Sequence, residues 1–385
     1  MSARIGSGLA ADDGVDAFAE AAARAQLALG GAPADLVVAF AGARSLDRAE
    51  EGLAAVEERL RPGALIGCGA QGVVGSGREL EDGGVAVWAA SLPGADVRSF
   101  HLEALSAGES ELAVAGMPDL DGSDAVILLA DPYSFPVEPL LEELGEEHPG
   151  LPVVGGLSSA GGGPGHAVLL RDGAVEDRGA VGVALRDVDV RACVSQGARP
   201  LGPEMVVTAC EDNVIEELAS RPALLRLKEA IAELDDDERA LAARGLLLGI
   251  VIDENQPDYE RGDFLIRGLL GMDEEAGSVT VGERVRVGQT VRLQARDAGS
   301  ADEDLREALE REAASLPRPP AGALLFTCNG RGSNMFPVPH HDAAALDTAF
   351  GGAAAAGFFC AGEIGPVGSR SFLHGFTATL AVFAG

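Results

Sequence analysis

The chain carries three copies of one order of elements, and this internal repetition constrains its fold more than any other sequence feature. Each copy begins with a short apolar run, continues through a stretch with apolar residues at helical spacing, and reaches a second short apolar run. A glycine-rich turn and a closing apolar run complete the copy. The opening runs are residues 36–40, 126–130 and 324–328, and the closing runs are residues 84–88, 179–185 and 375–383.

The middle of each copy predicts a helix followed by a glycine turn at the end of a strand. The helical stretches are residues 47–60, 137–144 and 342–350, and the strand and turn segments are residues 64–72, 153–161 and 357–365. This order predicts an α/β protein with mixed sheets flanked by helices, built from repeated strand, helix, strand, glycine turn and strand units in two domains. Ligands of α/β proteins usually bind at such strand ends.

A stretch of different character separates the second and third copies. Residues 211–234 predict a pair of helices that breaks at Arg221-Pro222, and a further helix is expected over 303–316. The short apolar runs between them predict an antiparallel sheet, with strands at residues 246–252, 264–270, 278–281 and 290–295. We place the domain border near 196–220, and predict an N-terminal helix over 1–32 and domains over 33–210 and 211–385.

The charge of the chain excludes several classes of function. Its 385 residues carry a formal net charge of −32, which disfavours nucleic acids and anionic membrane surfaces as partners. Lys228 is the only lysine, so phosphate-binding loops of the Gly-Lys-Ser/Thr type and Schiff-base chemistry are excluded. The sequence shows no signal peptide, no membrane-spanning run, and no cysteine spacing typical of zinc. We expect a cytoplasmic protein without metal or cofactor.

Two glycine turns match the sequence patterns of known motifs but lack the helix that each motif requires. Gly67, Gly69 and Gly72 match the dinucleotide-binding pattern, yet further glycines follow where the phosphate-binding helix should begin. The turn around Ser158 and Ser159 similarly resembles a degenerate nucleophile elbow without its helix. Structural roles are the alternative for both turns.

The richest polar cluster follows the opening strand of the third copy. Arg331 lies between Gly330 and Gly332, directly after Asn329, and Glu363 lies in the glycine turn of the same copy. A guanidinium group beside flexible glycines is suited to clamp a carboxylate. Glu363 either neutralises Arg331 in an internal ion pair or binds the ammonium group of a ligand, and the sequence leaves both open.

The segments described above resemble the FIST proteins, with paired N-terminal and C-terminal domains. The matching segments are residues 67–75 with Arg78-Glu79, 152–161, 261–267, 328–332, 362–365 and 374–379, and the resemblance covers roughly residues 33–383.

The resemblance implies a sensory module that binds a small molecule, such as an amino acid or another carboxylate, and signals through a separate protein partner. The predicted ligand-binding residues are Asn329, Arg331, Gly332, Glu363, Ser158, Ser159, Cys68, Gln71 and Arg261. Two alternatives stay open. One is a hydrolase or thiol enzyme that uses Ser158, Ser159 or a cysteine among Cys68, Cys328 and Cys360. The other is a haem-based nitric oxide sensor, implied by some FIST relatives, with His374 or a cysteine as axial ligand.

Overall fold

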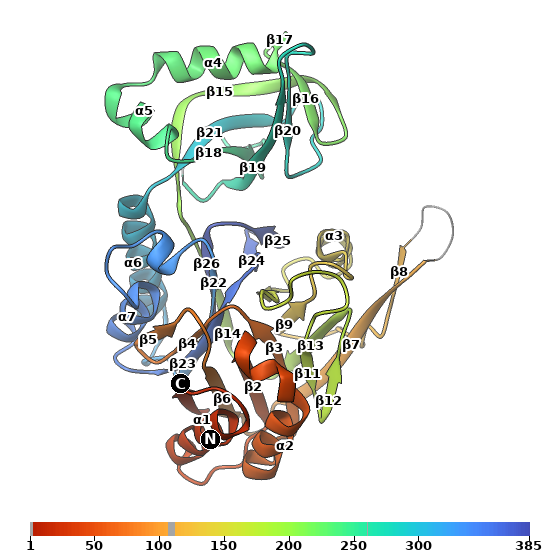
Figure 1. Cartoon of the computed structure of the whole chain (residues 1–385), viewed down its shortest axis with the longest axis vertical. Coiled ribbons are helices and arrows are strands. Elements are labelled where there is room, and N and C mark those ends of the chain that lie inside the picture. The colour runs from red at the N-terminus through yellow and green to blue at the C-terminus, as the bar shows by residue number, and fades with distance from the viewer. Residues whose placement is uncertain (1–2, 107–111, 260) are drawn as a thin grey trace. The chain divides into compact units, whose positions relative to one another are not determined.

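The structure is a computed structural model that describes residues 3–106, 112–259 and 261–385 (Figure 1). It divides into two compact units. Unit 1 comprises Met1–Val194, Leu305–Leu373 and Thr377–Gly385, and unit 2 comprises Ser195–Asp304 and His374–Phe376. The chain therefore leaves unit 1 within the third repeat and later returns to it. The domain borders expected at residues 32/33 and 210/211 stay predictions.

Unit 1 contains nearly all of the three predicted repeats, each with the predicted order of elements and an added strand at its start. The first repeat consists of β1 (Arg4–Ala10), α1 (Val15–Leu29), β2 (Leu36–Gly42), η1 (Ala43–Arg48), α2 (Ala49–Leu60), β3 (Ala64–Ala70), β4 (Val73–Gly75), β5 (Arg78–Leu80) and β6 (Val85–Ser91). The second consists of β7 (Asp96–Ser106), β8 (Leu112–Ala115), β9 (Ala125–Ala130), α3 (Val137–Glu147), β10 (Val153–Leu157), β11 (Leu169–Arg171), β12 (Ala174–Glu176) and β13 (Ala180–Arg186). The third consists of β14 (Val190–Gln196), α6 (Ala298–Ser315), β22 (Gly322–Cys328), η2 (Gly332–Asn334), α7 (His341–Ala349), β23 (Ala354–Cys360), β24 (Glu363–Val367), β25 (Arg370–His374) and β26 (Thr377–Phe383).

The sheets of unit 1 are mixed, which confirms the predicted fold class. In each repeat the two strands that flank the helix are parallel, and the closing strand is antiparallel to the first of them. Strands β2, β3 and β22 are buried along their whole length, because helices cover one face of each sheet and another sheet covers the other. The N-terminal region that was predicted as a helix contains α1 and also the edge strand β1.

One glycine in each repeat permits a close approach between the two parallel strands. A Cβ atom at these positions would lie within 2.1 Å, 1.9 Å and 1.8 Å of a backbone carbonyl oxygen, in the pairs Gly67 with Ala39, Gly155 with Leu128, and Gly357 with Leu325. No side chain fits at such distances, so these positions require glycine. Their equivalence shows that the repeats share backbone geometry as well as element order.

The hairpin that follows each glycine turn joins the sheet of a different repeat. Hairpin β4–β5 of the first repeat pairs with β23 of the third, β11–β12 of the second pairs with β3 of the first, and β24–β25 of the third pairs with β10 of the second. The same backbone hydrogen bond extends each pairing, from Gly69 N–H to Val168, from Leu157 N–H to Gly362, and from Phe359 N–H to Gly72. The exchange is therefore cyclic, and each sheet contains strands from two repeats.

The core of unit 1 lies where the inner faces of these three sheets pack together. Its largest members include Trp88, whose ring lies 4.7 Å from that of Phe383, and Phe40, whose ring stacks 4.9 Å from that of Phe358. Helices cover the outer faces: α1 and α2 lie on the first sheet, α3 on the second, and α6 and α7 on the third. Because one core joins all three repeats, none of them buries its apolar surface alone.

Unit 2 is built on a seven-stranded antiparallel sheet, and the expected strands are confirmed. Its strand order is β15 (Ala198–Glu211), β21 (Thr290–Arg296), β18 (Leu246–Val251), β19 (Phe264–Asp273), β20 (Ser278–Val281), β16 (Val214–Leu218) and β17 (Arg221–Pro222). Helices α4 (Ala223–Glu233) and α5 (Asp236–Ala242) contribute to the core on one side of it. Asp235 caps α5, because its side chain accepts the Glu238 N–H and the Glu238 carboxylate in turn accepts the Asp235 N–H.

The predicted helix over residues 211–220 is wrong. This segment instead forms the hairpin between β15 and β16, and the helix begins only at Ala223. Val214, Ile215 and Leu218 alternate with polar residues closely enough to fit either a strand or a helix, and pairing with β15 and β20 selects the strand. Across the described ranges, no helix combines the length and apolar character needed to cross a membrane.

Candidate functional site

The glycine turns of the three repeats meet at the carboxyl ends of the parallel strands of unit 1. Ser158, directly after β10, donates its hydroxyl hydrogen to the Gly69 carbonyl in the first turn, at 2.7 Å. Ser159 donates to the Phe359 carbonyl in the third repeat and accepts the Gln71 N–H at 2.9 Å. The second turn thus holds the other two in place.

A surface pocket with a volume of about 480 Å³ lies beside these turns. Its lining residues are Ala43, Arg44, Gln71, Asp82, Ser159 and Ala160. Two of them, Gln71 and Ser159, belong to the predicted ligand-binding set. The volume falls within the range of pockets that hold small molecules.

The pocket carries one cationic and one anionic side chain, neither of which was expected from the sequence. Arg44 follows β2 and is 62% exposed, and its Nε lies 2.7 Å from Asp13 Oδ2. Asp82 follows the hairpin β4–β5 and is exposed. An exposed ion pair contributes at most about 1 kcal/mol, so separating Arg44 from Asp13 costs little.

Arg331 is fully buried and paired with Asp342 of α7. Its Nε and Nη2 donate to the two carboxylate oxygens of Asp342 at 2.8 Å and 2.9 Å, while Thr327 donates to the same carboxylate at 2.6 Å. Burial alone would raise the pKa of Asp342, but the charge and hydrogen bonds of Arg331 hold it well below its ordinary value. Within the described part of the chain, Arg331 Nη1 has no hydrogen-bond partner.

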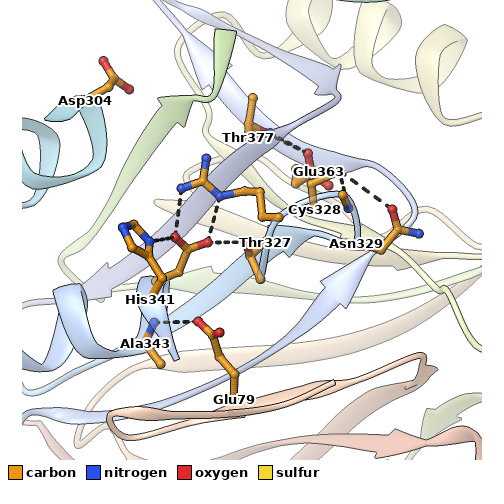
Figure 2. Close-up of polar contacts among 12 residues, drawn as sticks. Glu79, Asp304, Thr327, Cys328, Asn329, His341, Ala343, Glu363 and Thr377 are labelled. Atoms are coloured by element: carbon orange, nitrogen blue, oxygen red, sulfur yellow. Dashed lines mark hydrogen bonds and ion pairs between the residues drawn. The ribbon is translucent and has the colours of Figure 1, made fainter. Parts of the chain in front are cut away.

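Two aromatic rings surround this ion pair. The Arg331 guanidinium lies 5.1 Å from the ring centre of Phe336, and the Phe336 ring stacks on His341 at 3.5 Å with an angle of 6° between the planes. The Nδ1 of His341 is 2.8 Å from the Asp342 carboxylate (Figure 2). Aromatic faces stabilise a guanidinium that has lost its water, so the buried cation has both charge and ring partners.

Glu363 is a second buried carboxylate in the same repeat. Its Oε2 accepts the backbone N–H and the hydroxyl of Thr377 at 3.1 Å and 2.8 Å (Figure 2). Among the described residues, no nitrogen or oxygen donor reaches Oε1. Burial raises the pKa of Glu363 to about 8, although hydrogen bonds from Thr377 and Cys328 and the charge of Arg331 act in the opposite direction.

The raised pKa of Glu363 predicts that stability falls as pH rises. Between the ordinary value of 4.5 and about 8, the folded protein holds this proton and the unfolded chain does not, so higher pH favours unfolding. We expect Glu363→Gln to flatten the decline of Tm between pH 5 and pH 8, measured by circular dichroism. Glu51→Gln, at a carboxylate that is 54% exposed, should keep the wild-type slope. Equal slopes in wild type and Glu363→Gln would contradict the assignment.

Glu79 extends this polar cluster from the first repeat into the third. It lies in the exchanged hairpin β4–β5, and its Oε1 accepts the Ala343 N–H at the start of α7, at 2.9 Å (Figure 2). Burial and the negative charge of Asp342 raise the pKa of Glu79 to about 7, against backbone hydrogen bonds that lower it. The hairpin exchange therefore brings a carboxylate to the helix end that already carries Asp342.

The structure brings most of the predicted site residues to one end of unit 1. Gln71 and Ser159 line the pocket, Ser158 and Asn329 bond to neighbouring turns, and the others of this group are buried: Cys68, Arg331, Gly332 and Glu363. Arg261 belongs to unit 2, where it contacts the Ser300 carbonyl at 3.3 Å and Glu303 at 3.5 Å.

The ion-pair partner of Arg331 differs from the one considered in the sequence. Asp342, in the first turn of α7, binds the guanidinium in two parallel hydrogen bonds, whereas Glu363 bonds to Thr377. Asp342 begins the predicted helix 342–350, a position where aspartate ordinarily serves the helix end. Its sequence context is therefore typical of a helix start and gives no sign of the pairing with Arg331.

The two serines considered as nucleophiles have structural contacts, and two of the three cysteines have raised pKa values. The hydroxyl hydrogens of Ser158 and Ser159 are donated to backbone carbonyls. Burial raises the pKa values of Cys68 and Cys360 well above that of a free thiol, which keeps both thiols protonated.

The haem alternative rested on His374 or a cysteine. His374 is buried and ends β25. In the ranges that the structure describes, no group of three or more His, Cys, Asp or Glu side chains is arranged to hold a metal ion.

Comparison with known proteins identifies the two halves of the sequence. The family model of the FIST N domain matches residues 35–221, and that of the FIST C domain matches residues 223–366. The uncharacterized protein Rv0628c of Mycobacterium tuberculosis is 48% identical over 382 residues, covering 99% of both chains. The uncharacterized protein Mb0898c of Mycobacterium bovis is 45% identical over 382 residues, covering 99% of this chain and 98% of its own.

Proposed function

Because the chain belongs to the FIST family of sensory and signal-transduction domains, we propose that it is a sensory module that binds an amino acid or another small carboxylate. The observation that carries this proposal is the pocket of about 480 Å³ at the glycine turns, which combines opposite charges with hydrogen-bonding groups. The protein acts by binding rather than by catalysis. The engaged hydroxyls of Ser158 and Ser159 support this reading.

The lining residues suit a ligand that carries both an acid and an amine. The Arg44 guanidinium binds a carboxylate in two parallel hydrogen bonds, and the Asp82 carboxylate binds an ammonium group. The Gln71 amide and the Ser159 hydroxyl add a donor and acceptors that orient the ligand. A carboxylate without an amine uses the Arg44 side alone and binds more weakly.

The turn that contains Asn329, Arg331 and Gly332 supports this pocket from the third repeat. The Asn329 N–H donates to the Cys360 carbonyl at 2.9 Å, and the Ser333 N–H donates to Glu81 at 2.9 Å. Glu81 directly precedes Asp82, so the turn contacts the segment that supplies the anionic group of the pocket. In this proposal the buried side chains of Arg331 and Glu363 stabilise the turn. A separate protein partner recognises the ligand-bound form.

A thermal-shift screen with the protein amino acids and with acetate, succinate and citrate tests the pocket. A ligand present at about 100 times its Kd stabilises the protein by about 2.7 kcal/mol, which is an easily measured rise in Tm. We expect at least one amino acid to raise the Tm of the wild type, and expect the rise to vanish in Arg44→Gln and Asp82→Asn, because each variant removes one charge from the pocket.

The matched control for Arg44 is Arg48→Gln. Arg48 lies in the same short helix η1, is 63% exposed against 62% for Arg44, and is outside the pocket lining. This variant should keep the ligand-induced shift. Survival of the shift in both Arg44→Gln and Asp82→Asn, or no shift with any compound, would refute the assigned site.

A further inference from the structure

Two cysteines of the third repeat face each other across neighbouring parallel strands. Cys328 ends β22 and Cys360 ends β23, and the two residues are partners in the strand register. The backbone continues this pairing one residue further, since the Asn329 N–H donates to the Cys360 carbonyl at 2.9 Å. The backbone hydrogen bonds therefore fix the register of β22 against β23 at Cys328 and Cys360.

Both thiols lie on the inner face of the sheet. Side chains alternate along a strand, and Phe326 and Phe358, two residues earlier on each strand, belong to the inner core. Neighbouring strands lie about 4.8 Å apart, and residues in register are separated by about that distance. A disulfide needs Cα atoms about 4.4–6.8 Å apart with side chains on the same side, and the in-register pairing of Cys328 with Cys360 on one face satisfies both conditions.

The two thiols differ in their surroundings. Cys328 Sγ accepts the Gly330 N–H at 3.5 Å and lies 3.9 Å from Asn329 Oδ1, so it is in polar surroundings. Cys360 Sγ lies against the Gly156 backbone, where an added Cβ would meet the sulfur at 2.5 Å. Cys328 is 5% exposed and Cys360 is fully buried. Cys328 is thus the thiol that a small reagent reaches first.

Glu363 provides a base for Cys328. The thiol hydrogen-bonds to the Glu363 carboxyl group, and the positive charge of Arg331 interacts with both groups. In its ionised form, whose share grows as the pH approaches about 8, Glu363 accepts the thiol proton and leaves the nucleophilic thiolate, whose negative charge the guanidinium and the Gly330 N–H stabilise.

We propose that Cys328 and Cys360 are a redox pair, which hydrogen peroxide converts into a disulfide within the chain. The Cys328 thiolate attacks one peroxide oxygen, the O–O bond breaks, and the departing hydroxide takes the proton from Glu363 to give water and a sulfenic acid at Cys328. The Cys360 sulfur then attacks the Cys328 sulfur while its proton passes to the departing hydroxyl group, so that an S–S bond forms and a second water leaves. Two thiols lose two electrons and one peroxide gains them.

The disulfide has a structural consequence at the turn that follows β22. It links the ends of β22 and β23 and removes the Cys328 thiol from Glu363 and from the Gly330 N–H. The segment from Asn329 to Gly332 then carries a covalent constraint that the reduced protein lacks. Oxidation in this way acts on the same end of unit 1 as the pocket, although the pair forms whether or not a ligand binds there.

Peptide mapping of the oxidised full-length chain tests the proposal. The reduced protein is exposed to hydrogen peroxide, remaining thiols are blocked with N-ethylmaleimide in denaturant, and the chain is cleaved with trypsin. Because Arg331 lies between the two cysteines, they fall on separate peptides. We expect one cross-linked pair of peptides that contains Cys328 and Cys360, lighter by two hydrogens than their sum and separated by dithiothreitol.

Single variants distinguish this pair from its neighbour Cys68, whose thiol also influences Cys360. Cys328→Ser and Cys360→Ala should abolish the cross-linked peptides, whereas Cys68→Ala should keep them. If a variant fails to fold, the peptide map of the oxidised wild type alone shows which cysteines are linked. A Cys68 to Cys360 link, or oxidation that yields only sulfinic or sulfonic acids without any link, would overturn the proposal.

Discussion

Asp342→Asn should destabilise the protein by about 3–5 kcal/mol, the loss expected when one partner of a buried ion pair is removed. The amide keeps the shape of the side chain but leaves the Arg331 guanidinium, which is 0% exposed, without a counter-charge at its two donors. The hydrogen bond that Asp342 accepts from Thr327 is weakened as well. Urea unfolding followed by circular dichroism measures the shift.

A double variant distinguishes a lost charge partner from general disruption of the site. Arg331→Met with Asp342→Leu replaces both buried charges by apolar groups of similar size, and should be markedly more stable than Asp342→Asn. Glu51→Gln provides a surface control, because Glu51 and Arg48 are 54% and 63% exposed and their pair contributes at most about 1 kcal/mol. If Asp342→Asn costs no more than this control, the ion pair does not stabilise the fold as described.

Gly357→Ala should destabilise the protein by about 3 kcal/mol or more, the upper range of overpacking in a core. The added Cβ would lie 1.8 Å from the Leu325 carbonyl oxygen and 2.7 Å from its carbonyl carbon, and both are backbone atoms of a buried strand. Relief requires β22 and β23 to separate, which breaks the parallel ladder between them. Soluble yield and Tm report the effect.

Gly162→Ala is the matched control for this prediction. Gly162 lies in the loop after the second glycine turn, and a Cβ added there would meet no atom of the described residues within 4 Å. Its replacement should change the stability by less than about 1 kcal/mol. If Gly357→Ala unfolds at the same urea concentration as Gly162→Ala, the close strand approach inferred for the three repeats is wrong.

The repeat structure was predictable because its signals are local. Apolar runs such as residues 36–40 and 324–328 predict buried strands, and the glycine turns show where strands end. The failure at residues 211–220 has the same origin, since a short alternating run fits a strand or a helix until its partners are known. In this segment, pairing with β15 and β20 selects the strand.

The candidate site was predictable only in part. Gln71 and Ser159 were expected to bind a ligand, and both line the pocket. Arg44 and Asp82 were missed because each lies among other charged residues, as Arg44 does beside Asp47 and Arg48, and nothing in such a run indicates which side chain faces a cavity. The charge of Arg331 was noticed, but Asp342 was named only as the first residue of the predicted helix 342–350 and not as the partner of Arg331.

The sequence by itself determined the repeated unit, the class of fold, and the family, since these depend on periodicity and motifs among neighbouring residues. The tertiary structure alone decided which sheet each hairpin joins and which groups meet at the site. The bond from Ala343 to Glu79, across 264 residues of sequence, exists because the hairpin of the first repeat enters the sheet of the third. Backbone pairing is open to any strand edge, so only the shared core of the three repeats selects the partner.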